Sequence, residues 1–291
     1  MSSNVLSMDG LQSFDSGHRQ GKWSRHCCPF CGNAKPIDAA HRSLGLDPRT
    51  GFYKCFRCAS KGRLGDFVKL KDIDWQAIQR ERDEDHKRKQ RAVSHLLERL
   101  GPIEGPAADY LHRRGIDPVL AGESGCAYLD DYLSDKLGPP RAAIIFPIRD
   151  SSGAICALQG RYLDSQQPKT KTLGNNRVGL FETPGALETA HICVAESPID
   201  ALSLHLMGFP AVSVQGTTLS RRIIEECQKP QVDEKGSLIN RTVYICTDND
   251  AAGNVASLKW KNELLKAGIA SRRYKPEREG WDWNDQLLAT Q

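Results

Sequence analysis

The sequence predicts an α/β fold with a mostly parallel sheet and flanking helices, preceded by a small α+β subdomain and a compact N-terminal module. Short β-branched and aromatic runs at 191–195 and 242–246 are typical of buried strands. Each of them is followed by helical spacing of apolar residues, as expected when strands alternate with helices. At the other end of the chain, two Cys-x-x-Cys pairs mark the N-terminal module.

The composition is that of a globular protein. The chain has 291 residues, of which 39% are hydrophobic and 26% charged. No apolar run reaches membrane-spanning length, and residues 1–11 lack the basic start and apolar core of a secretory signal. Cys156, Cys193 and Cys246 lie inside apolar runs, where a free cysteine behaves as a small hydrophobic residue. We therefore expect a reduced, cytoplasmic protein with no membrane partner.

The cysteine pairs predict a four-cysteine zinc ribbon in the first domain, residues 1–75. Each pair places two thiolates on one tight turn, and two such turns form a tetrahedral site for one structural Zn²⁺. The predicted ligands are Cys28, Cys31, Cys55 and Cys58. His26 and Cys27 are spare donors beside the first pair, but only Cys28 has the matching gap to Cys31.

Basic and aromatic residues are interleaved through the same domain. Basic groups can follow phosphates while aromatic faces stack on bases, so the pattern suits single-stranded DNA. The residues are Lys22, Trp23, Arg25, Lys35, Arg42, Phe52, Tyr53, Lys54, Phe56, Arg57, Lys61 and Arg63. Residues 1–75 carry 12 Lys/Arg against 7 Asp/Glu, whereas residues 191–291 carry 12 against 13. We therefore expect the polyanion-binding surface at the front of the chain.

A charged linker and a small basic subdomain are expected next. Residues 76–103 are rich in charges of both signs and predict a solvated helix over 76–100, ending at a Gly-Pro boundary. In the subdomain, residues 104–188, the pattern predicts a short helix at 107–114 and a hairpin of strands 142–150 and 154–162.

An acidic residue follows each of three predicted strands in the last domain, residues 189–291. Parallel strands end at one edge of a sheet, where open α/β sheets bind ligands. The residues are Glu196 after 191–195, Asp248 and Asp250 after 242–246, and Asp282 and Asp285 after 270–274. Carboxylates this close repel each other, and a bound Mg²⁺ or Mn²⁺ would remove the repulsion.

Asp200 is a further acid, expected to support this site from the first turn of a helix. Ser197 fits the N-cap of that helix and Pro198 its first position.

Two stretches carry a family resemblance. The strand–acid–helix contexts and the Asp-x-Asp-x-x-Gly motif at 248–253 resemble the Toprim domain of primases and topoisomerases. Residues 52–58, with Lys61-Gly62 and the Gly-Asp-Phe-Val run at 65–68, resemble the zinc-binding domain of DnaG-type DNA primases. In that family one ligand of the first pair is often histidine, whereas here the position is Cys31.

The middle of the chain extends this resemblance. Phe146-Pro147-Ile148, Gly153 and Gly160-Arg161 are similar to the segment that precedes Toprim in DnaG-type primases, where basic residues hold nucleotide phosphates or template. Arg161 is the best match to them, and Lys169 and Lys171 both fit the position of the family's lysine.

The resemblance implies a DNA primase that makes short RNA primers on single-stranded DNA by Mg²⁺-dependent nucleotidyl transfer. Asp248 and Asp250, with Asp282 or Asp285, would hold the metal, and Glu196 would act as a general base or as another metal ligand. The implied partners are a single-stranded DNA template, nucleoside triphosphates and a separate replicative helicase.

The sequence also suggests a compact form of such an enzyme. No Gly-x-x-x-x-Gly-Lys-Ser/Thr phosphate loop occurs, so we expect no fused helicase. The chain ends just after the Toprim elements, so we expect the helicase-docking domain of cellular primases to be missing. Such a form resembles the primases of phages, plasmids and integrating elements.

Three other functions would use parts of the same sequence. A Toprim nuclease would use the same carboxylates with water as nucleophile, but the primase-type ribbon argues against it. A non-catalytic accessory protein that binds single-stranded DNA would not need the acidic residues. A topoisomerase would need a tyrosine domain, for which the sequence offers no candidate.

Overall fold

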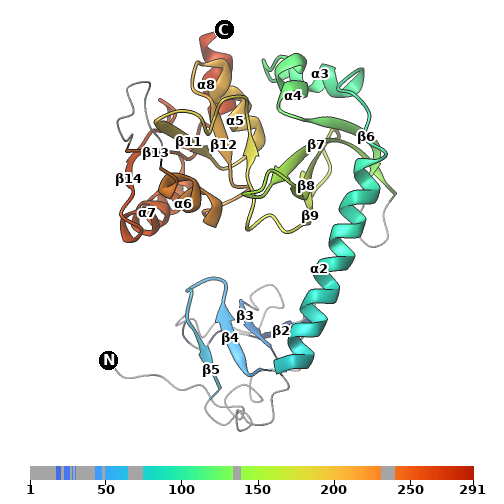
Figure 1. The fold of residues 1–291 in the computed structure, drawn as a ribbon, viewed down its shortest axis with the longest axis vertical. Helices are drawn as coiled ribbons and strands as arrows, with labels where there is room; N and C mark the ends of the chain where they lie inside the picture. Colours follow the sequence, from blue (N-terminus) through green and yellow to red (C-terminus); the bar gives the residue numbers. More distant parts are fainter. Residues whose placement is uncertain are drawn as a thin grey trace. The chain divides into compact units, whose positions relative to one another are not determined.

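The chain forms two compact units, Met1–Arg82 and Asp83–Gln291, and each is considered by itself (Figure 1). The computed structural model describes residues 18–20, 23–26, 28, 30, 43–47, 50–64, 75–133, 139–230 and 240–291. Within these ranges, no helix is both long and apolar enough to cross a membrane.

The first unit contains a five-stranded sheet in which each strand pairs antiparallel with the next along the chain. The strands are β1 (His18–Gln20), β2 (Trp23–His26), β3 (Leu44–Leu46), β4 (Phe52–Cys55) and β5 (Lys61–Arg63). Among the described residues, the buried core cluster of this unit consists of Leu44, Leu46, Tyr53, Cys55 and Leu64. A small module commonly needs a metal or another cross-link to fold.

Helix α2 (Trp75–Leu97) corresponds to the predicted charged linker helix. Most of its residues from 79 to 92 are exposed, in agreement with a solvated helix. Its last two turns differ, because Val93 and Leu96 are buried against Leu129 and Tyr162 of the second unit. The helix therefore has an apolar, packed end that the run of charges did not predict.

The second unit begins with an antiparallel sheet of order β6-β7-β8-β9. Its strands are β6 (Ala127–Tyr132), β7 (Arg141–Arg149), β8 (Ile155–Tyr162) and β9 (Thr170–Gly174). The predicted hairpin of β7 and β8 is confirmed. Successive β7 side chains point to opposite faces, so Ile145 packs with the end of α2 while Ile144 and Phe146 join the largest core cluster.

The second sheet of this unit has the order β10-β12-β11-β13-β14. Its strands are β10 (Phe181–Glu182), β11 (His191–Ala195), β12 (Ala211–Ser213), β13 (Thr242–Cys246) and β14 (Ala270–Arg273). β10 pairs antiparallel at one edge, and the other four strands run parallel. The prediction of a mostly parallel sheet is therefore confirmed.

Helices cover both faces of this sheet, with α5 and α8 on one side and α6 and α7 on the other (Figure 1). Their bounds are α5 (Pro198–Leu206), α6 (Arg221–Gln228), α7 (Ala251–Lys266) and α8 (Trp283–Thr290). Along β11, Cys193 and Ala195 face α5 and α8, whereas Ile192 and Val194 face Trp260 of α7. Because both faces of this sheet are buried, its central strands are apolar at successive positions.

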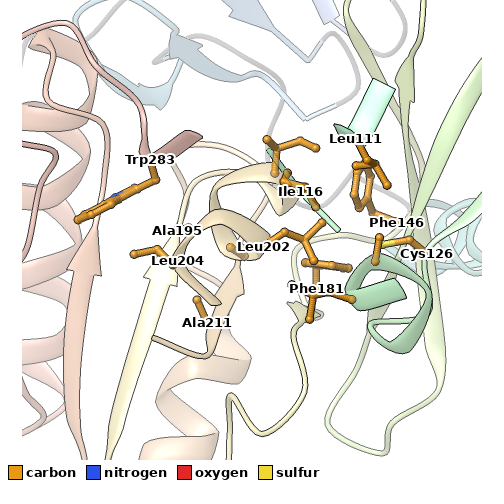
Figure 2. Close-up of a cluster of buried hydrophobic side chains, with 14 of the residues drawn as sticks. Leu111, Ile116, Cys126, Phe146, Phe181, Ala195, Leu202, Leu204, Ala211 and Trp283 are labelled. Carbon is orange, nitrogen blue, oxygen red and sulfur yellow. The ribbon is translucent and has the colours of Figure 1, made fainter. Parts of the chain in front are cut away.

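Two short helices, α3 (Pro106–Arg113) and α4 (Pro118–Glu123), pack into the same core cluster as α5 and α8. Figure 2 shows Leu111 and Ile116 from this segment together with Phe146, Phe181 and Leu202. The segment before the antiparallel sheet therefore lies against the parallel sheet's helices, which brings residues far apart in the sequence to one place.

Gly253 lets α7 start directly beside the end of β13. A Cβ at this position would lie 2.1 Å from the backbone oxygen of Asp248. The Gly253 N–H donates to the Asp250 carboxylate (2.6 Å), and the Thr247 hydroxyl donates to the Gly253 oxygen (3.0 Å). The glycine of the Asp-x-Asp-x-x-Gly motif thus sets how closely the helix follows the two aspartates.

Gly253→Ala should destabilise the protein by about 1–3 kcal/mol, because the added methyl group has no space beside Asp248. Gly122→Ala is the matched control, since Gly122 lies in α4 with no atom within 4 Å of its would-be Cβ. Denaturant unfolding of both variants checks this, and equal midpoints would contradict the close approach.

Candidate active site

The carboxyl ends of β11 and β13 lie side by side and carry two of the predicted acids. The strands pair in parallel with Ala195 opposite Cys246, so Glu196 and Asp248 follow on neighbouring strands. The Asp248 N–H donates to Glu196 Oε1 over 3.4 Å. The strand order therefore brings together residues that are 52 positions apart in the sequence.

Two more acids are held at the starts of helices. Ser197 is the N-cap of α5, as predicted, and its hydroxyl donates to Asp200 Oδ2 over 2.6 Å. Asp282 is the N-cap of α8 and accepts from the Asp285 N–H over 2.7 Å, while the Asp285 carboxylate accepts from the Asp282 N–H. This reciprocal capping box fixes the direction of the Asp282 side chain.

These acids share a pocket of about 370 Å³ with two arginines. The lining residues come from both sheets of the second unit and from α3. They are Tyr110, Arg114, Phe146, Gln159, Arg161, Thr170, Glu196, Ser197, Pro198, Ile199, Asp200, Gln215, Gly216, Asp248 and Asp282. The pocket thus places negative groups at a sheet edge and positive groups from the preceding segments around one space.

Burial is the main cause of the raised pKa values of Glu196, Asp200 and Asp248. It raises the pKa of Asp248 to about 8, with repulsion from Asp200, Glu196 and Asp282 adding to the effect. Burial, and then the charge of Asp282, raises the pKa of Asp200 to about 7. The pKa of Glu196 is also raised by burial, although the hydrogen bond from the Asp248 N–H opposes the rise.

The residues present fit a divalent cation. Asp248 Oδ1 is buried and has no hydrogen-bond partner among the described residues. A buried acceptor without a donor is costly, and a small hard cation that prefers carboxylate oxygen would satisfy it. Glu196, Asp200 and Asp282 supply further oxygens around the same pocket. A Mg²⁺ or Mn²⁺ held by these acids would also remove the repulsion that raises the pKa of Asp248.

The pocket's arginines are themselves held in place. Arg161 Nε donates to the Tyr110 hydroxyl over 3.0 Å. Arg114 donates to Asn284 Oδ1 over 3.1 Å, and Asn284 donates back to the Arg114 backbone oxygen over 2.7 Å. Asn284 is fully buried, so this bond joins the end of α3 firmly to the start of α8.

Sequence reasoning named Arg161 but missed five polar residues of the pocket: Tyr110, Arg114, Gln159, Thr170 and Gln215. Arg114 could not be found from spacing, because its partner Asn284 is 170 residues away. Gln159 lies within β8 and Gln215 follows β12, so neither stands out from an ordinary strand in the sequence. The alternation along β8 is one available signal, since Gln159 and Arg161 share a face.

Four predicted residues lie outside the pocket lining. The Asp250 carboxylate caps α7, and that of Asp285 completes the capping box of α8. Lys171 pairs with Gly160 in the β8–β9 ladder, next to the pair of Arg161 with Thr170. Because Arg161 and Thr170 both line the pocket, Lys171 lies on the opposite face of the sheet, and Lys169 precedes β9.

The first unit holds a cysteine cluster. The sulfur atoms of Cys28, Cys55 and Cys58 lie within 4.8 Å of one another, and those of Cys28 and Cys58 are 3.7 Å apart. Tetrahedral zinc with sulfur at about 2.3 Å requires sulfur atoms about 3.8 Å apart, so the spacing suits zinc. The predicted fourth ligand, Cys31, lies outside the described residues.

Hydrogen bonds prepare Cys55 for a metal. Burial would raise the pKa of its thiol, but hydrogen bonds with the Cys58 N–H, the Ser43 hydroxyl and the Arg57 N–H lower it to about 6. The thiolate is the form that binds metal, so this cysteine is ready to coordinate near neutral pH.

The other face of the first unit's sheet carries basic and aromatic side chains. Cross-strand pairing puts Arg25, Gly45 and Lys54 in one row. A Cβ at Gly45 would lie 2.8 Å from Phe56 and 3.1 Å from Trp23, so the glycine lets these rings cover the middle of the sheet. The Phe56 ring is half exposed, with the Arg25 guanidinium 4.3 Å from its centre. Of the predicted basic residues, Lys22, Lys35 and Arg42 lie outside the described residues.

The chain is similar to proteins of known function. Residues 193–287 match a family model described as Toprim-like. The DNA primase of Thermotoga maritima is 25% identical over 303 residues, which cover 85% of this chain and 51% of that protein. The DNA primase of Deinococcus radiodurans is 25% identical over 316 residues, which cover 90% of this chain and 53% of that protein. The chain thus spans about half the length of the curated relatives it matches.

Solved structures share the fold. The zinc-binding and RNA polymerase domains of the Aquifex aeolicus primase match with a TM-score of 0.54 at 21% identity, over 98% of this chain and 80% of that chain. A DnaG primase catalytic domain solved with bound single-stranded DNA matches with a TM-score of 0.51 at 17% identity, over 72% of this chain and 78% of that chain. These structures confirm the predicted fold class. The Toprim-like match and the similarity to DNA primases confirm the resemblance to DnaG-type primases.

Without a divalent cation, thermal stability should fall as the pH rises from about 5 to about 8. The folded pKa values of Asp248 and Asp200 are about 8 and about 7, above the value of about 4 for an unfolded aspartate. The folded state therefore keeps protons that the unfolded state has released, and stability is lost as the pH rises through the folded values. Melting curves with and without excess Mg²⁺ check this: Mg²⁺ should flatten the pH dependence, and an equal slope in both would contradict it.

Cys58→Ser should lose one bound zinc and unfold the first unit, because a metal supplies most of the folding free energy of so small a core. The second unit should keep its melting transition. Zinc analysis and hydrogen exchange measure both effects, with Cys227→Ser in α6 as the control that keeps its zinc. Finding no zinc in freshly purified wild-type protein would refute the assignment.

Proposed function

We propose that this chain is a DNA primase that synthesises short RNA primers on single-stranded DNA. The proposal rests on the observation that Glu196, Asp248 and Asp282 line the same pocket as Arg114 and Arg161. Arginines hold phosphate oxygens, and a divalent ion between carboxylates and phosphates balances the charge of both. Similarity to proteins named DNA primase over most of the chain supports the same reaction.

The proposed reaction is attack of a 3′-hydroxyl on the α-phosphate of a nucleoside triphosphate, with release of pyrophosphate. A Mg²⁺ or Mn²⁺ at the acids would neutralise charge that develops on the phosphates. Arg114 and Arg161, which line the same pocket, bind the triphosphate, and each is held by its own hydrogen bond. Their fixed positions reduce the entropy that is lost when the substrate binds.

Glu196 takes the proton of the attacking hydroxyl in this proposal. Burial raises the pKa of Glu196, and a carboxylate with a raised pKa is a stronger base. Asp248 and Asp282, which line the pocket, would hold the divalent cation. Asp250 and Asp285 stabilise the starts of α7 and α8 by capping them. Asp200 supports Asp248 and Asp282 from the first turn of α5.

Template binding is assigned to the exposed sheet face of the first unit. Trp23 and Phe56 offer stacking surfaces, and Arg25 and Lys54 offer charges for phosphates. The four-cysteine zinc site would hold this face together from behind. Lys169 and Lys171 stay predicted template contacts outside the pocket, and a separate replicative helicase stays the predicted protein partner.

Asp248→Asn should reduce primer synthesis by orders of magnitude while the protein stays folded, because metal stabilisation of the transferring phosphate supplies much of the acceleration. The assay contains single-stranded circular DNA, labelled ribonucleotides and Mg²⁺, with products sized on a gel. Asp130→Asn, at an exposed position on β6, is the matched control.

The same assay separates the primase from a nuclease. Labelled oligonucleotides that vanish in Asp248→Asn support the proposal. Shortened DNA without incorporated nucleotide, lost in the same variant, would establish a nuclease and refute it.

Phe56→Ala and Lys54→Ala should weaken binding of single-stranded DNA in different ways. Loss of one stacked base costs about 1–3 kcal/mol at every salt concentration, whereas loss of one phosphate contact lowers the salt slope by about 1. Fluorescence anisotropy of a labelled oligonucleotide at several salt concentrations distinguishes them. Leu265→Ala on the exposed side of α7 serves as control, and binding unchanged in both test variants would rule out this face.

A further inference from the structure

Asp282 lies at the end of an irregular segment, so other residues must fix the backbone that places it in the pocket. β14 ends at Arg273, and α8 begins at Trp283, with no strand or helix between them. Asp282 is the last residue of this connection and lines the pocket beside Asp248. A metal ligand on such a segment needs its backbone fixed, because a small displacement would take the carboxylate out of reach.

Asn249 lies between the two aspartates of the Asp-x-Asp motif and makes its polar contacts with this segment. Its side-chain Nδ2 donates to the Pro276 oxygen over 2.9 Å, and its Oδ1 accepts from Lys275 Nζ over 3.0 Å. Its backbone N–H donates to the Trp281 oxygen over 2.9 Å, and its backbone oxygen accepts from the Gly280 N–H over 2.8 Å. All four polar groups of one residue thus bind one connection.

The arrangement holds the segment at both ends. The Asn249 side chain binds Lys275 and Pro276, the second and third residues after β14. Its backbone binds Gly280 and Trp281, the two residues directly before Asp282. Asn249 is only 6% exposed, so water competes little for these bonds. The amide offers a donor for Pro276 and an acceptor for Lys275 on two separate atoms, so one side chain makes both bonds at the same time.

We propose that Asn249 is a positioning residue that fixes Asp282 relative to Asp248 and thereby sets the affinity of the site for its divalent cation. This inference rests on the proposed function only in assuming that the pocket binds such a cation. We call these four hydrogen bonds between Asn249 and residues 275–281 the clamp. The Asp-x-Asp motif by itself leaves this middle position unspecified.

Direct titration with Mn²⁺, followed by electron paramagnetic resonance of the free ion, tests the clamp without reference to activity. Asn249→Ala should bind Mn²⁺ about 10–100-fold more weakly than wild type, as is usual when a partner that orients metal ligands is lost. Asn175→Ala removes an amide that caps a turn elsewhere, and should bind as wild type does. Equal affinity in Asn249→Ala and wild type would overturn the proposal.

Lys275→Met gives a second test in which two explanations predict opposite signs. If Lys275 acted only as a positive charge near the acids, its removal would strengthen cation binding. The clamp predicts weaker binding, because Asn249 Oδ1 loses its donor. Tighter binding in Lys275→Met would therefore count against the clamp even if Asn249→Ala failed to fold.

Two further measurements separate this inference from the proposed function. Hydrogen exchange at residues 277–281 should become faster in Asn249→Ala, while exchange in β11 stays slow. Primer synthesis by Asn249→Ala should recover towards wild type at saturating Mn²⁺, whereas that of Asp248→Asn should not. If the wild type binds Mn²⁺ but makes no primers, the proposed function fails and the clamp is still decided by the binding data.

Discussion

Repulsion among carboxylates buried at one edge of a sheet is the constraint on which the second unit depends. Glu196, Asp200, Asp248 and Asp282 line one pocket, and burial with mutual repulsion raises the pKa of three of them. The starts of α5 and α8 carry two of these acids. Because the N-terminus of a helix bears a partial positive charge of about half a unit, these helices offset part of the repulsion. A cation and the two arginines of the pocket can supply the rest.

The strands and the order of the acids could be predicted from the sequence because both depend on local pattern. Apolar runs such as 242–246 are buried on both faces, and parallel strands must end at one edge, so Glu196 and Asp248 were expected to be neighbours. Helix starts were equally readable: Ser197 and Pro198 occupy the positions that their side chains favour. The cysteine spacing likewise predicted four zinc ligands, and the structure brings together the three that it describes.

Other parts of the site depend on contacts that no local pattern records. Arg114 is in the pocket only because α3 packs against α8, through a bond to a residue 170 positions later. Asn249 has a role only because an irregular connection folds over it. Asp250 is a residue that the motif does identify, as a metal ligand. The structure shows in addition that its carboxylate accepts a hydrogen bond from the Gly253 N–H at the start of α7, which the spacing alone does not reveal.

Helix α8 has a consequence for the stage of synthesis at which the pocket can form. It contributes Asp282 to the pocket, Asn284 to the bond with Arg114, and Trp283 and Leu287 to the largest core cluster. A growing chain on the ribosome contains Glu196 and Asp248 before α8 has been made, so neither the pocket nor the core beneath it can close until then. Contacts of such long sequence separation also cost loop-closure entropy, which slows folding. The pocket is therefore incomplete in a nascent chain that lacks α8, and its assembly coincides with the packing of that helix.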